Sequence, residues 1–214
     1  MHVYDLEMAD CGCEIEVKTK QESRVLLILL GINAFMFVAE ISFGIISQST
    51  ALIADSLDML ADATVYGIAL YAVGRSILAK IKAAYMSGIF QILLGISVVV
   101  DIVRRLIWGS EPVSVLMISI GIIALIANTI CLILISKHKD GEVHMRASWI
   151  FSRNDVIANL GIIIGGFLVY LLDSRWPDLI IGLAITLIVI RGGINIVKDA
   201  ANEKQTLLSS RQVK

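Results

Sequence analysis

Residues 49–62 have the sequence STALIADSLDMLAD, which places three carboxylates in a segment otherwise apolar enough to cross a bilayer. An α-helix advances about 100° per residue, so Asp55, Asp58 and Asp62 fall within roughly 60° of one another on one face. A single carboxylate inside a membrane span costs about 2.5–3.5 kcal/mol even on the lenient insertion scale. We therefore expect this acidic face to have a partner, and a cation is the obvious candidate.

The composition is that of a membrane protein. The chain has 214 residues, is 57% hydrophobic and has a mean hydropathy of +0.83, whereas soluble domains average about 45–50% apolar residues. The net charge of −1 argues against a nucleic-acid partner. The three cysteines do not form a disulfide framework, because one lies in an apolar run and two in a polar N-terminal segment.

Six apolar segments are each long enough to cross the hydrocarbon core, which takes about 20 helical residues. Helices satisfy their own backbone hydrogen bonds in lipid. The segments lie near residues 25–46, 51–73, 84–107, 113–135, 148–172 and 177–197. The sequence therefore predicts an all-α polytopic protein with one six-helix transmembrane domain over residues 25–198, flanked by polar cytoplasmic tails at 1–24 and 199–214.

Lysine and arginine residues are concentrated on one side of these predicted spans. They precede the first span, follow the last, and occupy the connections between spans two and three and between spans four and five. The opposite side holds Arg104, Arg105 and Arg175. The positive-inside rule then places both termini in the cytoplasm, and in a bacterium the membrane would be the inner one.

The remaining intramembrane polar residues suggest which side chains supply the other metal ligands of the acidic site. Oxygen ligands could come from Asp58, Asp62, Asp155 and either Asn159 or Asn154, and we expect no intramembrane His or Cys beside them. Zn²⁺ accepts Asp oxygens, but an oxygen-rich site leaves Mn²⁺, Fe²⁺, Co²⁺ or Cd²⁺ open.

Several other polar residues receive secondary roles. Asn33 and Glu40 lie on one face of the first span and could be accessory to the site or simply hydrogen bond between helices. Asp101 and Asp178 stand at span ends, where a solvated or capping carboxylate is expected. The tail residues Cys11 and Cys13 could collect a thiophilic metal, although an ordinary reduced tail accounts for them equally well. His138 and His144, between spans four and five, invite the same interpretation with less support.

The pattern resembles the cation diffusion facilitator family of divalent-metal/proton antiporters. The resemblance rests on QSTALIADSLDMLAD at 48–62, DVIAN at 155–159 and WPD at 176–178. It implies a six-span fold, export of a divalent metal (Zn²⁺ first of all) in exchange for protons, and no prosthetic group. It also implies a transport site made of a His/Asp-x-x-x-Asp pair on span two and another on span five, which Asp58 and Asp62 match.

Span five departs from that family pattern. The residue four positions before Asp155 is Phe151, which cannot ligate a metal, so Asn159, Asn154 or water would have to replace it. The family's usual C-terminal cytoplasmic domain is not expected, since residues 199–214 alone follow the last span. Family members are commonly homodimers. Asp55, nearer the outer mouth, becomes a candidate exit or proton-relay group.

Other classes of function remain open at this point. The protein could be a membrane metal-binding or regulatory protein with weak transport, or a cation channel lined by the acidic face. An intramembrane enzyme is not expected, because the spans contain no His-Glu-x-x-His motif and no Gly-x-Ser-x-Gly motif.

Overall fold

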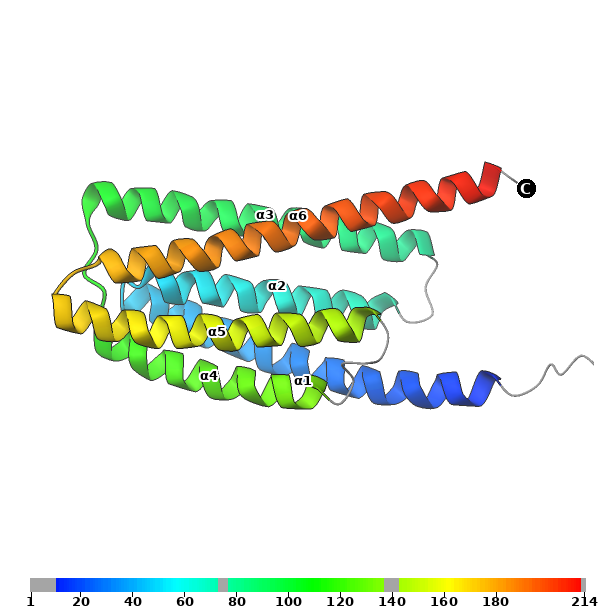
Figure 1. Ribbon diagram of the computed structural model, residues 1–214, viewed down its shortest axis with the longest axis horizontal. Coiled ribbons are helices and arrows are strands. Elements are labelled where there is room, and N and C mark those ends of the chain that lie inside the picture. Colours follow the sequence, from blue (N-terminus) through cyan, green and yellow to red (C-terminus); the bar gives the residue numbers. More distant parts are fainter. Residues whose placement is uncertain (1–10, 73–76, 137–142, 213–214) are drawn as a thin grey trace, which may run out of the picture.

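The protein is a bundle of six long α-helices in a computed structural model that describes residues 11–72, 77–136 and 143–212 (Figure 1). In chain order the helices are α1 (Cys11–Ile46), α2 (Thr50–Ala72), α3 (Ile77–Trp108), α4 (Ser114–Ser136), α5 (Val143–Leu172) and α6 (Trp176–Gln212). The described residues contain no strand. The predicted all-α, multi-pass membrane fold is therefore confirmed.

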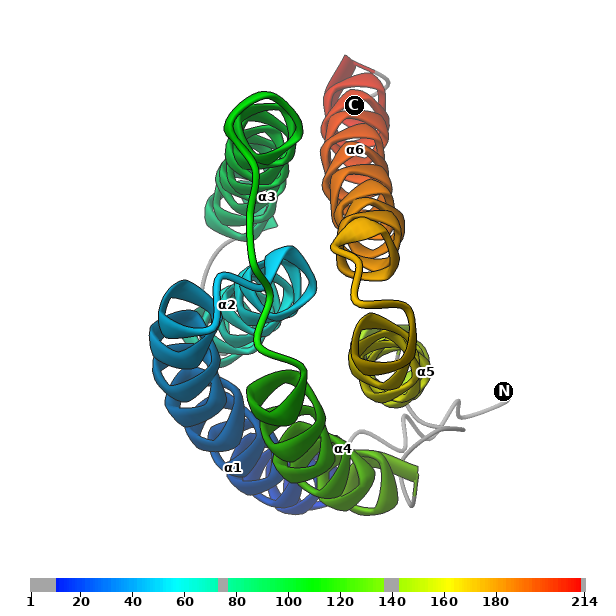
Figure 2. The same cartoon turned by 90° about the vertical axis from the view of Figure 1, so that its left-hand side faces the viewer.

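Five of the six helices are long and apolar enough to cross a membrane. The exception, α2, has sufficient length but carries Asp55, Asp58 and Asp62. The position of α2 explains how a helix with three carboxylates can lie within the membrane, because α2 is surrounded by α1, α3, α5 and α6 (Figure 2). Neighbouring helices thus shield its acidic face from lipid.

The helices pack as three neighbouring pairs, α1 with α2, α4 with α5, and α3 with α6. The main apolar core joins α2 to α3, α4, α5 and α6 through buried side chains such as Leu52, Val98, Met117, Ile162 and Ile185. The pair α3 and α6 lies to one side of the other four helices, and α2 links the two groups (Figure 2).

The α1–α2 and α3–α4 connections, at the end of the bundle opposite the termini, bond to each other. The α1–α2 turn passes through Gln48 with a φ of 52°, and its Ser47 carbonyl accepts a 2.9 Å hydrogen bond from the N–H of Val113. The Arg105 guanidinium, on α3, donates to the Gln48 carbonyl and to Asp101. Gly109 has a φ of +90°, which favours glycine. This end of the bundle is therefore tied across several helices.

Candidate metal-binding site

The acidic face of α2 is almost fully buried. Asp55 is 1% exposed, Asp62 is 5% exposed and Asp58 is half-buried. Buried like charges on one face repel unless protons, a basic group or a cation neutralises them. No Lys or Arg ion pair reaches these three carboxyls within the described part of the chain. A proton or a cation is what remains to neutralise them.

A second carboxyl, from α5, meets this face at Asp62. Asp155 is 5% exposed, and its carboxyl lies close to the Asp62 carboxyl, near enough for the two groups to interact. Tyr66, one turn along α2, donates a 3.2 Å hydrogen bond to Asp62 Oδ2. Two carboxyl groups can hydrogen bond only through a shared proton. A divalent cation can take the place of that proton between the same oxygens.

Asn159 adds an oxygen next to this pair. It is fully buried, and its Nδ2 donates a 2.7 Å hydrogen bond to the Asp155 carbonyl, one turn earlier on α5. Its Oδ1 has no hydrogen-bond partner among the described residues. A buried acceptor without a donor is costly unless something else binds it. An amide oxygen held in this way fits a cation ligand.

Asn154 lies elsewhere, although it precedes Asp155 directly. Its side chain is exposed and lines a shallow cavity of about 440 Å³ between α5 and α6. Of the two asparagines that the sequence offered as a replacement for the missing ligand, only Asn159 is brought into the buried interior.

The predicted ligands do not all converge in this conformation. Within residues 11–72, 77–136 and 143–212, no group of three or more His, Cys, Asp or Glu side chains lies close enough to hold a metal ion. Asp58 and Asp62 are one turn apart, about 6 Å along the axis, and Asp155 stands opposite Asp62. The geometry is that of a carboxyl pair, with Asp58 one turn further toward the α1–α2 turn.

A second pair of buried carboxyls lies about one turn from Asp58, at Asp55. Glu40 of α1 is fully buried, and its carboxyl faces that of Asp55 on α2. The carboxyl oxygens of both residues are buried without a hydrogen-bond partner among the described residues. Glu40 is therefore paired with Asp55 and is not part of the Asp62–Asp155 cluster.

A cysteine of α4 lies close to Tyr66. Cys131 packs in one apolar cluster with this tyrosine, which donates a hydrogen bond to Asp62. Asn33 of α1 approaches the Cys131 Sγ at 4.0 Å through Nδ2, which also donates to the Leu29 carbonyl at 2.9 Å. Only tertiary packing reveals this contact, because Cys131 sits in a largely apolar segment.

Asn128 lies three residues before Cys131 on α4. It is fully buried, and neither its Nδ2 nor its Oδ1 has a hydrogen-bond partner among the described residues. The Oδ1 of Asn33 is unpartnered as well. Two buried amides, on α1 and α4, therefore have polar atoms that the described residues do not satisfy.

The carboxylates expected at span ends do have structural roles. Asp178 caps a helix, as predicted, but it is fully buried and the helix is α2, which follows Ser49. Asp101 binds Arg104 and Arg105 at 2.6 Å and 2.5 Å. Neither residue belongs to the carboxyl cluster.

Several residues singled out in the sequence fall outside the described residues. The side chains of Cys11, Cys13, Phe151 and His144 are among them, as is the whole of His138.

A family model supplies an independent classification. The model of the cation efflux transmembrane domain matches residues 26–203. The chain is also similar to several curated transporters, among them three from different organisms. It is 26% identical over 196 residues to the zinc transporter ZitB of Yersinia pseudotuberculosis, covering 85% of this chain and 62% of that protein. It is 23% identical over 192 residues to the cadmium, cobalt and zinc/H(+)-K(+) antiporter of Bacillus subtilis, covering 83% and 61%.

The third relative has a higher sequence identity over a shorter alignment. The chain is 32% identical over 143 residues to the vacuolar zinc transporter ZRC1 of Saccharomyces cerevisiae, covering 59% of this chain and 31% of that protein. This chain thus spans about three fifths, 62%, of the bacterial zinc transporter that it matches. Since the domain model extends over most of the sequence, the chain belongs to the cation diffusion facilitator family.

Proposed function

We propose that the protein exports a divalent metal cation in exchange for protons, through a site made by Asp58, Asp62, Asp155 and Asn159. The observation that carries this proposal is the buried Asp62–Asp155 carboxyl pair across α2 and α5, next to the unpartnered Asn159 Oδ1. These groups offer three oxygen donors, and Asp58, one turn along α2, offers a fourth.

Exchange at this site is a competition for the same oxygens. A cation binds the deprotonated carboxylates, and protons displace it when the site opens to a more acidic compartment. A proton gradient across the membrane then gives the cycle its direction. The fully buried Glu40–Asp55 pair lies further along α2, toward the α1–α2 turn, where it can take part in cation exit or in proton transfer.

The transported metal is Zn²⁺ in the first instance, with Mn²⁺, Fe²⁺, Co²⁺ and Cd²⁺ as competitors. The matched relatives are named for zinc, and one of them for cadmium, cobalt and zinc. Carboxylate and amide oxygens alone select weakly among these ions.

The cellular arrangement follows the same proposal. One transmembrane domain spans residues 25–198, between the polar segments 1–24 and 199–214, and both termini face the cytoplasm. A bacterial cell would place it in the inner membrane. We expect no enzymatic activity and no prosthetic group, and a homodimer is the assembly we expect from the family.

Flux measurement tests this proposal directly. Purified protein in liposomes, with an internal zinc dye and a pH dye, should show zinc entry coupled to opposite proton movement. Asp62→Asn and Asp155→Asn should each reduce this flux at least about tenfold, because each removes a charged oxygen from the pair. Asp199→Asn, an exposed change on α6, is the matched control.

The possible outcomes separate the functions. Zinc current without proton movement would identify a channel, and zinc binding without flux would identify a binding protein. Undiminished flux in both aspartate variants would show that the site is elsewhere.

A further inference from the structure

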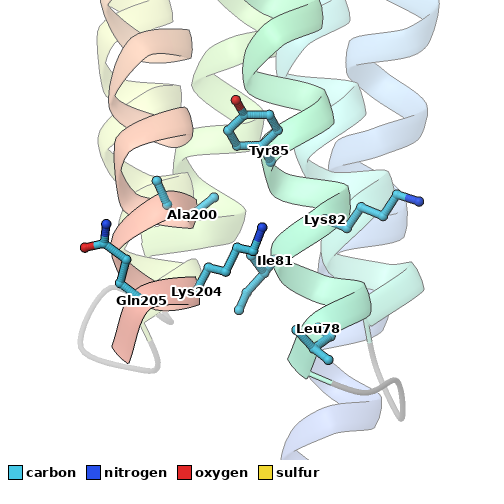
Figure 3. Close-up of a pocket in the computed structure, with 8 residues that line it drawn as sticks. Leu78, Ile81, Lys82, Tyr85, Ala200, Lys204 and Gln205 are labelled. Atoms are coloured by element: carbon cyan, nitrogen blue, oxygen red, sulfur yellow. The ribbon is translucent and has the colours of Figure 1, made fainter. Parts of the chain in front are cut away.

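An open cavity of about 820 Å³ lies between α3 and α6, at the end of the bundle where the chain begins and ends (Figure 3). This cavity is far from the carboxyl cluster and takes no part in the proposed transport. Its lining consists of Leu78, Ile81, Lys82, Tyr85, Ala200, Ala201, Lys204 and Gln205.

The cavity forms because α3 and α6 are in close contact at one point and diverge from there toward the end of the bundle where the chain begins and ends. A Cβ atom on Gly88 would lie 2.9 Å from the Gly193 carbonyl oxygen, and one on Gly193 would lie 2.8 Å from the Gly88 carbonyl oxygen. The backbones of α3 and α6 therefore cross in contact at these glycines. Beyond the crossing they separate (Figure 1), and the small side chains of Ala200 and Ala201 leave the space between them open.

The height of the cavity matches the headgroup layer of a bilayer. At 1.5 Å per residue, Lys82 lies about 39 Å from Trp108 at the far end of α3. By the same measure Lys204 lies about 42 Å from Trp176 at the far end of α6. A bilayer with its headgroups is about 40–45 Å thick. The two lysines, on different helices, therefore stand at one level, that of the lipid phosphates.

The cavity combines an apolar wall with positive charge. Ile81 and Ala200 are 5% and 3% exposed and form the inner wall. In Figure 3 the Lys204 side chain lies between the two helices beside Ile81, and Tyr85 lies deeper, toward the middle of the bundle. Among the described residues that line the cavity there is no Asp or Glu, and the acidic neighbours on α6, Asp199 and Glu203, are exposed and are not among these lining residues.

We propose that this cavity binds one anionic phospholipid, with its phosphate beside Lys204 and the start of an acyl chain against Ile81 and Ala200. The Lys82 side chain extends from the side of α3 that faces away from α6 and adds positive charge at the same level (Figure 3). Basic residues between helices at this depth bind anionic headgroups, and an aromatic residue such as Tyr85 suits the border between headgroup and acyl chain. The lipid fills the gap between α3 and α6 and so holds the two helices at a fixed separation.

Native mass spectrometry of the detergent-purified full chain tests this site, with phosphatidylglycerol or phosphatidylcholine titrated in. The wild type should retain one phosphatidylglycerol molecule in preference to phosphatidylcholine. Lys82→Ala/Lys204→Ala should weaken this binding about thirtyfold, since each basic residue near an anionic lipid contributes about fivefold. Lys82→Arg/Lys204→Arg keeps both charges and should bind like the wild type.

The matched control removes two positive charges at the same end of the bundle but outside the cavity. Arg24→Ala/Lys198→Ala changes two exposed residues and should leave the first phosphatidylglycerol bound. The proposal is overturned if the Lys82/Lys204 alanine pair binds phosphatidylglycerol as the wild type does, or loses no more than the control pair. Equal retention of both lipids, competition by inorganic phosphate alone, or a dimer that depends on these lysines without lipid would overturn it as well.

Discussion

The carboxylate of Asp178, at the start of α6, accepts a 2.6 Å hydrogen bond from Ser49 Oγ at the start of α2. It also accepts hydrogen bonds from the N–H groups of Thr50 and Ala51, at 2.7 Å and 3.0 Å. Ser49 Oγ in turn accepts from the Leu52 N–H at 3.2 Å. The first N–H groups of α2, which have no partner within the helix, are thus satisfied partly by another helix.

We predict that Asp178→Ala destabilises the protein by about 2 kcal/mol, because it leaves two buried backbone N–H groups and one hydroxyl without an acceptor. Ser49→Ala should cost about 1 kcal/mol. Thermal unfolding in detergent measures both. Since the residues share a bond, the double variant should lose less than the sum of the single losses. Asp199→Ala, exposed on the same helix, should remain within about 0.5 kcal/mol of the wild type.

A second prediction concerns the contact between α6 and this same turn. A Cβ on Gly182 would lie 2.9 Å from the Thr50 carbonyl carbon and 3.0 Å from the Ala51 nitrogen, which are backbone atoms and cannot move aside cheaply. Gly182→Ala should therefore destabilise the protein by roughly 1–3 kcal/mol. The control is Gly161→Ala, where the nearest atom would be at 3.8 Å. Equal unfolding temperatures for the two variants would contradict the observed packing.

The adjacent asparagines of α5 allow a third test. Asn159→Ala should raise the zinc dissociation constant about tenfold, because it removes a buried oxygen beside Asp155 and the bond that orients it. Asn154→Ala, one helical position from Asp155 but exposed, should change it less than about twofold. Isothermal titration calorimetry provides the values. Asn159→Asp keeps an oxygen donor and should bind zinc at least as tightly as the wild type, so a loss there as well would argue against ligation.

Zinc should also stabilise the folded protein through the same residues. A ligand at one hundred times its dissociation constant adds about 2.7 kcal/mol of stability. We expect this increase in unfolding temperature for the wild type, reversal by a chelator, and its absence in Asp62→Asn/Asp155→Asn. If the double variant is stabilised equally, the Asp62–Asp155 pair is not where zinc binds.

The Glu40–Asp55 pair should affect transport more than binding. Because Glu40 faces Asp55 and not the Asp62–Asp155 cluster, Glu40→Gln should leave zinc affinity within about threefold and slow flux about tenfold. Comparing calorimetry with liposome flux separates the two effects. A large loss of affinity would instead make Glu40 part of the binding site.

Local sequence patterns predicted much of this arrangement. Hydropathy located all six helices, and helical periodicity placed Asp58 and Asp62 on one face. Hydropathy did not predict that α1 begins at Cys11 or that α6 continues to Gln212, since it detects the part of a helix suited to lipid and not the polar turns beyond it.

Contacts between helices could not be predicted from local sequence patterns. Asp178 and Ser49 are 129 positions apart, and the sequence around either residue does not indicate the other as its partner. The same is true of Asn33 and Cys131, 98 positions apart. A lone cysteine in an apolar run carries no periodic signal, so its place near Tyr66 depends on how α2 and α4 pack.

The hydrogen bonds from α2 to Asp178 hold the end of α2 that follows the α1–α2 turn, so this end can act as a pivot. A tilt of α2 by about 10° around this point would move Asp55 by about 1 Å, Asp62 by about 3 Å and Ala72 by about 6 Å, at 1.5 Å of rise per residue. Metal–oxygen bonds of about 2.0–2.2 Å do not survive a 3 Å displacement. A single pivoting helix can therefore make or break coordination at Asp62 while the Glu40–Asp55 pair stays almost in place.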